Sequence, residues 1–352
     1  MHRLNARRTW GFVAIALVVC LLLALLLPAS AYAEPNGPPS ALDPASPAAV
    51  AIANLHNAVL IVAVAIFAIV EGLLLFAAFR FRRRPKDDSV PAQIHGNTRL
   101  EIAWTVAPAL IVVALFVMTL QAQRDIDASS VAVAAPGVSV NVEVKGHRWW
   151  WEFRYPGLGI TTAGELVIPT GRVVDLTITS VDIIHSFWAP ELGGKTDAIP
   201  NVVNKSFLRA DQPGQYYGQC AELCGVSHAQ MRFVVTAKTP DEFDAWVRQQ
   251  AQDYTPPAET AAQAGEQLFG AVGCAGCHVI RGMAVAKGQT GPDLTHVSSR
   301  PYLAGGILGN TPLNQARWLQ NPPGLKPGSL MPNLKLPQAD IDSLVAFLQT
   351  LK

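Results

Sequence analysis

Two long apolar stretches constrain the fold of this chain more than any other feature of its sequence. The first runs from about residue 48 to residue 81 and the second from about residue 100 to residue 121. Each is long enough to cross the hydrocarbon core of a bilayer, about 30 Å thick, as an α-helix. Cations at the end of the first stretch mark the cytoplasmic side; they are Arg80, Arg82, Arg83, Arg84 and Lys86. We therefore expect a two-helix transmembrane hairpin, residues 48–122, with both ends on the outer side.

The N-terminus has the three parts of a secretory signal peptide. The basic start MHRLNARR is followed by an apolar stretch from about Trp10 to Leu27 and by small residues before Glu34. This pattern predicts a signal peptide over residues 1–33 and a flexible mature N-terminus over residues 34–47. The alternatives are an uncleaved third membrane helix and a lipoprotein anchor at Cys20, although the residues before Cys20 lack the small side chain that such an anchor favours.

The composition argues against a purely soluble protein. Of the 352 residues, 50% are hydrophobic and 15% are charged, and the formal net charge is +1. The length exceeds that of one ordinary domain, and the charge distribution gives no sign of a nucleic acid partner. We expect a multi-pass membrane protein with its remaining domains on the outer side.

From residue 131 to about residue 240 the sequence consists of short runs separated by Gly and Pro. The runs Val138–Val144, Gly164–Pro169, Val173–Thr179 and Arg232–Thr236 have the alternation or the composition of β-strands. About a hundred residues suffice for a Greek-key β-sandwich. That fold is our prediction for residues 131–240.

One stretch of this region concentrates metal-binding side chains. Cys220, Cys224, His228 and Met231 lie close together in the sequence, and His185 precedes them. Thiolate and thioether are soft donors that favour copper, and a second cysteine exceeds the needs of a mononuclear blue-copper site. Two thiolates can instead bridge two ions, so we predict a binuclear copper site. A structural zinc site, which would leave Met231 unexplained, and a disulfide between the two cysteines are the alternatives.

A short helix and a linker at residues 241–258 lead to a separate domain at residues 259–352. Its Cys274-Ala-Gly-Cys277-His278 is the C-x-x-C-H attachment signature of a c-type haem, in which both thiols bind the haem covalently and His278 ligates the iron. Met331, in Gly-Ser-Leu-Met-Pro, resembles the methionine loop of small class I cytochromes c, which implies that it is the second axial ligand. His296 is the competing candidate.

The stretch from Cys220 to Met231 resembles the CuA loop of cytochrome c oxidase subunit II. The resemblance implies a cupredoxin-like sandwich in which both cysteines bridge two coppers, each copper has one histidine, and a methionine and a glutamate carbonyl are weak outer ligands. Carried over to this chain, the ligands are His185, Cys220, Glu222, Cys224, His228 and Met231. In the family the carboxylate at the position of Glu222 also binds magnesium at the contact with subunit I, which must supply further ligands. The C-terminal domain resembles the all-α class I cytochromes c.

Two further residues match family positions with roles in electron and proton transfer. Trp149 begins a run of three tryptophans that resembles the W-Y-W segment, whose first tryptophan receives electrons from cytochrome c; packing is the alternative role. Glu101 begins the segment E-I-A-W-T-V-A-P, which is similar to the start of the second membrane helix, where the glutamate lies at the mouth of a proton channel. Thr98 and Glu101 also form a T-x-x-E capping box, which requires no proton role.

The resemblance covers nearly everything from Ala48 to Lys352 and implies the electron-transfer subunit of a caa-type haem-copper cytochrome c oxidase. It also implies a bacterial plasma (inner) membrane, with the CuA and cytochrome c domains on the periplasmic side. Electrons from cytochrome c or another periplasmic donor would pass through haem c and CuA to haem a of subunit I. Oxygen reduction and proton pumping would take place there, and subunit III is a further expected partner. A CuA-containing nitric oxide reductase subunit and a membrane-anchored copper and haem electron carrier remain alternatives.

Overall fold

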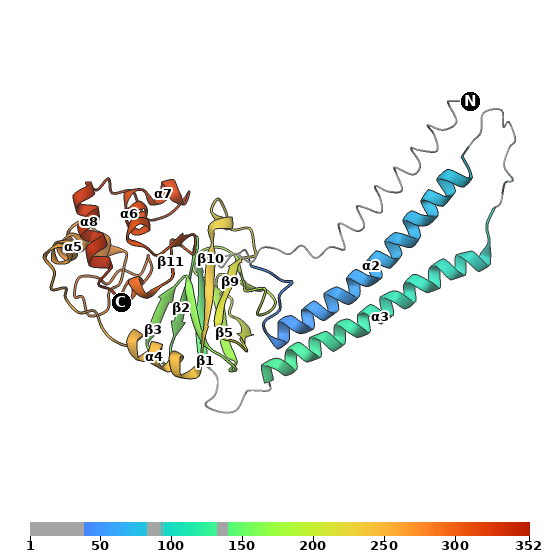
Figure 1. Cartoon of the computed structure of the whole chain (residues 1–352), viewed down its shortest axis with the longest axis horizontal. Coiled ribbons are helices and arrows are strands. Elements are labelled where there is room, and N and C mark those ends of the chain that lie inside the picture. The colour runs from blue at the N-terminus through green and yellow to red at the C-terminus, as the bar shows by residue number, and fades with distance from the viewer. Residues whose placement is uncertain (1–38, 83–92, 94, 132–139) are drawn as a thin grey trace, which may run out of the picture. The chain divides into compact units, whose positions relative to one another are not determined.

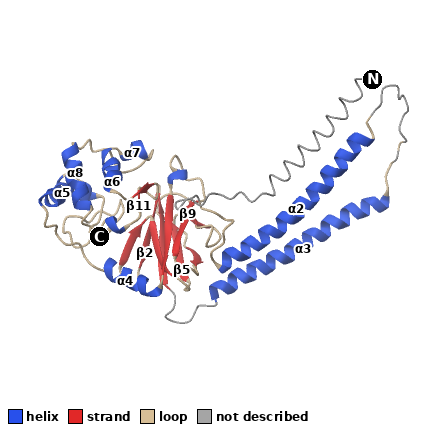
Figure 2. Cartoon of the chain, viewed as in Figure 1, coloured by secondary structure: helices blue, strands red, loops and turns tan. Residues whose placement is uncertain are grey.

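The computed structural model describes residues 39–82, 93, 95–131 and 140–352 (Figure 1). The predicted signal peptide, Cys20 and the cations Arg83, Arg84 and Lys86 lie outside the described residues. The described elements belong to three classes, namely two long helices, a β-sandwich and a set of shorter C-terminal helices (Figure 2). The predicted fold class is thereby confirmed.

The two longest helices carry the apolar stretches. Helix α2 spans Pro47–Arg80 and helix α3 spans Thr98–Val131. Within the described part of the chain, they are the two helices that are long and apolar enough to cross a membrane. Their apolar side chains face outward, as the 70% exposure of Ile61 illustrates, so a lipid environment is needed to cover them. Helix α3 continues past residue 121, where its apolar stretch ends.

The first turn of α2 is bonded to the sandwich. Ser46 Oγ accepts the backbone N–H of Ala49 at 3.0 Å and donates to the carbonyl oxygen of Leu192 at 2.8 Å. Ala45 adds a backbone hydrogen bond to Glu191 at 2.8 Å. A single serine therefore caps the helix and fastens its N-terminal end to the sandwich.

Helix α3 is capped one residue earlier than we predicted. Asn97 Oδ1 accepts the backbone N–H groups of Arg99 and Leu100, and the Glu101 carboxylate accepts the Asn97 N–H at 3.2 Å. The predicted capping box with Thr98 is wrong, because the asparagine side chain already satisfies the first free N–H groups of the helix. Glu101 nevertheless accepts a hydrogen bond from the backbone of the capping residue, as the acidic residue of a capping box does.

The sandwich consists of two five-stranded sheets. One has the order β3-β2-β1-β5-β8 and the other β4-β10-β9-β6-β7. Both are mixed, because β1 runs parallel to β5 and β10 runs parallel to β4 while the other pairs are antiparallel. The strands are β1 Val140–His147, β2 Trp150–Tyr155, β3 Ile160–Ala163, β4 Glu165–Pro169, β5 Val174–Ser180, β6 His185–Trp188, β7 Thr196–Ala198, β8 Asn204–Leu208, β9 Gly214–Cys220 and β10 Arg232–Lys238.

Aromatic rings from both sheets fill the space between them. Phe187 and Phe233 stack with ring centroids 4.5 Å apart, and the edge of Trp151 meets Phe187 at 5.5 Å. All three side chains are buried. Phe233 lies opposite Gly218 in the β9–β10 ladder, and its ring occupies the space that a side chain at Gly218 would need. This core fixes the ends of β6 and β9, from which the sulfur and imidazole side chains project.

The C-terminal region is helical and has its own apolar core. Helix α4 (Pro240–Gln250) leads out of the sandwich, and the later elements are α5 Thr260–Ala271, β11 Tyr302–Leu303, β12 Leu308–Gly309, α6 Pro312–Gln320, α7 Pro322–Leu325 and α8 Gln338–Leu348. Helices α5 and α8 pack closely because Gly265 has no side chain; a Cβ there would lie 2.0 Å from the Ser343 carbonyl oxygen. Phe269 and Phe347 meet beside this crossing at 5.7 Å.

The aromatic core predicts that Gly218→Ala destabilises the sandwich. The added methyl group would lie 2.1 Å from Phe233 Cζ, and overpacking of this kind costs about 1–3 kcal/mol. Thermal unfolding of the purified full-length protein measures the effect. Gly157→Ala is the matched control, because nothing lies within 4 Å of that position. Equal stability of the two variants would contradict the packing described.

Candidate functional site

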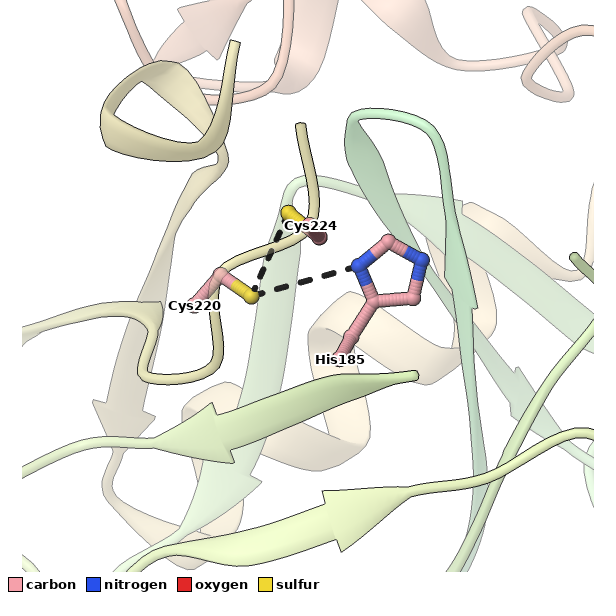
Figure 3. Close-up of side chains that lie close together, drawn as sticks. All are labelled: His185, Cys220 and Cys224. Atoms are coloured by element: carbon pink, nitrogen blue, oxygen red, sulfur yellow. Dashed lines mark hydrogen bonds between the residues drawn. The ribbon is translucent and has the colours of Figure 1, made fainter. Parts of the chain in front are cut away.

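Two cysteines and a histidine come together where β6 begins and β9 ends (Figure 3). Cys220 Sγ lies 3.7 Å from Cys224 Sγ and 3.9 Å from His185 Nδ1. All three side chains are buried. A disulfide requires about 2.05 Å between the sulfur atoms, and both cysteines are free. The structure therefore excludes the disulfide alternative in favour of a metal-binding arrangement.

The remaining predicted ligands line the same small volume. His228 Nδ1 and Met231 Sδ lie 3.5 and 3.9 Å from Cys224 Sγ, and the Glu222 carbonyl oxygen lies 3.2 Å from Cys220 Sγ. A backbone hydrogen bond of 2.9 Å from Cys220 to Met231 closes the loop. All six predicted residues are thus brought together. Two thiols, two imidazoles and a thioether fit copper, since the thioether has no place in a structural zinc site.

The hydrogen bond between the two thiols lowers the pKa of Cys220 and raises the pKa of Cys224. The lowered pKa favours the thiolate of Cys220, the form that binds metals. A bound cation would stabilise both thiolates, so metal binding is accompanied by proton release.

Asp182 orients the histidine. The carboxylate oxygen Oδ1 of Asp182 lies 2.8 Å from His185 Nε2, which leaves Nδ1 to face the sulfur atoms. Burial alone would raise the pKa of Asp182, but hydrogen bonds from His185 and from the backbone of Ile183 and Arg148 hold it below its usual value. A carboxylate that holds a ligand histidine in one orientation strengthens metal binding.

A second site lies in the helical region. One cavity is lined by Cys274, Cys277, His278 and Met331, and apolar side chains complete its wall; these include Leu294, Val297, Leu303, Leu319 and Leu330. His278 Nδ1 donates to the Pro292 carbonyl oxygen at 2.8 Å, which leaves Nε2 for iron. Burial lowers the pKa of His278, which favours the neutral ring that binds a metal. The residues fit a c-type haem.

His296, the competing candidate for the second axial position, does not line this cavity. It is buried, with Nδ1 2.7 Å from the Lys352 carbonyl oxygen and Nε2 3.0 Å from that of Gln252. Both ring nitrogens therefore already have backbone partners. The geometry favours Met331, which does line the cavity.

Trp149 connects the two sites. Its Nε1 donates to the Cys224 carbonyl oxygen at 2.7 Å, and it lines the haem cavity together with Arg148 and Trp150. The side chain is 8% exposed.

Trp149 lies in the turn between β1 and β2 rather than in a strand, which explains why three consecutive tryptophans break the alternation of a strand.

Three families match successive parts of the chain. Residues 40–122 match the transmembrane domain of cytochrome c oxidase subunit II, residues 159–238 match its periplasmic domain, and residues 262–352 match cytochrome c. Cytochrome c oxidase subunit 2 of Alkalihalophilus pseudofirmus is 38% identical over 322 residues, covering 89% of this chain and 91% of the relative. The chain belongs to the cytochrome c oxidase subunit II family.

Other relatives of this subunit II include proteins of the genus Bacillus. The cytochrome c oxidase subunit 2 proteins of Bacillus sp. PS3 and Bacillus subtilis are 36% and 34% identical, covering 77% and 80% of this chain and 79% and 82% of the relatives. A crystal structure of the periplasmic domain of subunit II of cytochrome oxidase from Bradyrhizobium japonicum is 30% identical, covers 33% of this chain and 95% of its own, and has a TM-score of 0.32.

The predicted family, electron-transfer function and membrane localisation are confirmed. This subunit II belongs to a haem-copper oxidase complex with subunit I, spans the membrane with two helices, and has a periplasmic CuA domain and a fused cytochrome c domain. It is a copper and haem c protein. The role of each individual ligand remains a prediction.

Two side chains of the site have little signal in the sequence. Asp182 lies three residues before the ligand His185. Carboxylates near a histidine in the sequence are too common for this one to be singled out. Lys326 is a buried lysine whose neighbours come from distant segments. Only the folded chain shows either contact.

The Asp182 contact predicts a change in copper affinity. Asp182→Ala removes the acceptor that orients His185 and should weaken copper binding by roughly 10–100-fold. Competition titration of the purified subunit against a copper chelator measures this. Asp175→Asn is a control on an exposed carboxylate of the neighbouring strand β5. An unchanged affinity for Asp182→Ala would show that Asp182 does not support the ligand.

Proposed function

We propose that this subunit II carries electrons from cytochrome c or another periplasmic donor to haem a of subunit I, by way of its own haem c and then its CuA site. In this proposal oxygen is reduced to water in subunit I with coupled proton pumping, and subunit III is a further partner. When bound, the haem and the copper pair each supply a one-electron redox couple.

The observation that carries this proposal is the double contact of Trp149. Its indole donates a hydrogen bond to the backbone of the ligand Cys224 at 2.7 Å, and the same residue lines the cavity that contains His278 and Met331. A Cβ at Gly328, in the Met331 loop, would lie only 2.7 Å from Trp149 Cη2. Trp149 therefore touches the surroundings of both cofactors, which supports its role as the residue that receives electrons on the way to copper.

The proposed copper ligands follow the distances around the two sulfur atoms. Cys220 and Cys224 would hold both coppers, and His185 and His228, each beside one sulfur atom, would hold one copper each. Met231 and the carbonyl oxygen of Glu222 would be the weak outer ligands. Both approach from within the same loop.

The proposed haem ligands share one cavity. Cys274 and Cys277 would attach the haem, and His278 and Met331 would be the two ligands of its iron. Support comes from the bond between His278 and Pro292, which fixes the imidazole ring. A methionine ligand raises the reduction potential of a haem compared with two histidines.

This ligation predicts distinct outcomes for two variants. Met331→Ala should abolish the charge-transfer absorption of methionine-ligated ferric haem and lower the haem reduction potential. His296→Gln should leave both unchanged, because His296 contacts backbone carbonyls and not the cavity. Optical redox titration of the purified complex measures them. Absence of this absorption from the wild type, together with a changed reduction potential in His296→Gln, would reverse the assignment.

The copper loop also offers a surface to subunit I. We propose that the Glu222 carboxylate binds magnesium there. Leu223 beside it is 80% exposed, which favours a covered surface in the complex. Lys195 Nζ lies 4.0 Å from the Glu222 carboxylate, and its charge opposes a bare cation. Carboxylates of the partner are therefore required to complete the site.

Two proposals concern the rest of the chain. Glu101 lies at the mouth of a proton channel into subunit I, a role compatible with its hydrogen bond to the Asn97 N–H. The domains are a cleaved signal peptide at residues 1–33, membrane helices within 48–122, the CuA domain at 131–240 and the cytochrome c domain at 259–352.

Rapid mixing of the purified oxidase complex with a reduced donor tests the proposed route. Haem c should be reduced before copper, and Trp149→Phe, which removes the indole N–H, should slow copper reduction several-fold without slowing haem c reduction. Trp246→Phe is the control, because that indole packs against Tyr155 at 5.4 Å and does not line the haem cavity. Copper reduction ahead of haem c would overturn the route. Unchanged kinetics in Trp149→Phe would assign that residue to packing.

A further inference from the structure

Lys326 is a buried amine between the two cofactor-binding domains. It is 4% exposed, and its Nζ donates to the carbonyl oxygens of Trp149, Ala304 and Gln230 at 2.6, 2.7 and 2.9 Å. An ammonium group has three N–H donors, so each donor has one acceptor. Within the described part of the chain, no carboxylate lies within ion-pair distance of it. The amine is held by backbone dipoles alone.

The three acceptors come from both domains. Trp149 belongs to the β1–β2 turn of the CuA domain, and Gln230 directly precedes the copper ligand Met231. Ala304 directly follows β11 in the cytochrome c domain. Lys326 belongs to the same domain. The bonds of one side chain therefore span the domain boundary at the point where Trp149 contacts the haem cavity.

Two glycines pack closely around the Lys326 amine and the Trp149 ring. Gly305 has a φ of +72°, and a Cβ there would lie 2.5 Å from Lys326 Nζ and 2.7 Å from the Trp149 carbonyl oxygen. Gly328 has a φ of +78° and abuts the Trp149 ring in the same way. Two left-handed glycines thus allow the segments on either side of Lys326 to approach Trp149 closely.

Other hydrogen bonds at this boundary involve fixed groups. The Arg232 N–H donates to the Gly305 carbonyl oxygen at 2.9 Å, and Ser227 Oγ donates to that of Pro327. Transient electron-transfer contacts bury little surface and rely on long-range charge. A buried amine and backbone hydrogen bonds instead define one relative position of the two domains.

Burying this amine costs free energy. Burial lowers the pKa of Lys326 to about 7, because an ammonium group loses hydration in an apolar environment. An exposed lysine would avoid that cost. Leaving buried carbonyl groups without a donor is also unfavourable, so removing the amine should separate the segments it joins.

We propose that Lys326 is a positioning residue that holds the cytochrome c domain in one orientation against the CuA domain, with Trp149 between the two cofactors. This inference rests on the proposed route from haem c to copper and adds the side chain that fixes its geometry. Lys326 lines the haem cavity beside Trp149, and its Nζ donates to backbone carbonyl oxygens. It acts through the carbonyl groups of Trp149 and Gln230.

The test uses the complete, cofactor-loaded oxidase with Lys326→Met, which keeps an unbranched stem and removes the donors. Pulsed EPR of the frozen complex measures the magnetic coupling between the copper centre and the oxidised haem, and flash-induced reduction measures the transfer rate between them. We expect a broadened distance distribution and several-fold slower transfer from haem c to copper. Lys335→Met, on an exposed lysine of the same domain, should match the wild type in both.

An unchanged distance distribution or an unchanged transfer rate in Lys326→Met would overturn the proposal. If Lys326→Met loses a cofactor, Gly305→Ala provides the same measurements, because its methyl group displaces the amine while the charge stays. The order of haem c and copper reduction in the wild type tests the route itself. A failure of the proposed function is therefore distinguishable from a failure of this inference.

Discussion

The 3.7 Å separation of the Cys220 and Cys224 sulfur atoms is the constraint on which the rest of this structure depends. Two thiols so close cannot both ionise without a cation, and they are too far apart to form a disulfide. The sandwich maintains the spacing by ending β9 at Cys220 and by bonding that residue to Met231 across the loop. A rigid scaffold of this kind keeps the ligands in place in both redox states, so each electron transfer requires little rearrangement.

The haem-binding region is arranged around the same loop. Its cavity is walled partly by Arg148, Trp149 and Trp150 of the sandwich, and the indole of Trp149 bonds to the backbone of a copper ligand. Fusion of the two domains thus does more than raise the local concentration of a donor. The residues at this contact hold the two domains in one relative position. The hydrogen bond from Ser46 to Leu192 separately fastens the sandwich to its membrane helix.

Features encoded by neighbouring residues were predictable from the sequence. Spacing alone predicts that Cys220, Cys224, His228 and Met231 lie in one loop and that Cys274, Cys277 and His278 lie at one site, and the structure brings the latter three to one cavity. Contacts between distant segments were not predictable: the neighbours of Lys326 lie 177, 96 and 22 residues away along the chain. The cap of α3 was misassigned for a different reason. Asn97 and Thr98 are both good capping residues, and only the backbone geometry decides between them.

The acceptors of the Lys326 amine have a consequence for how this protein tolerates mutation. A backbone carbonyl is present whatever side chain its residue carries, so positions 230 and 304 can change during evolution without loss of their bonds. Position 326 has no such freedom, because no other natural side chain ends an unbranched apolar stem with three donors. The contact therefore confines its mutational sensitivity to position 326 and to the glycines Gly305 and Gly328, while positions 230 and 304 are free to change.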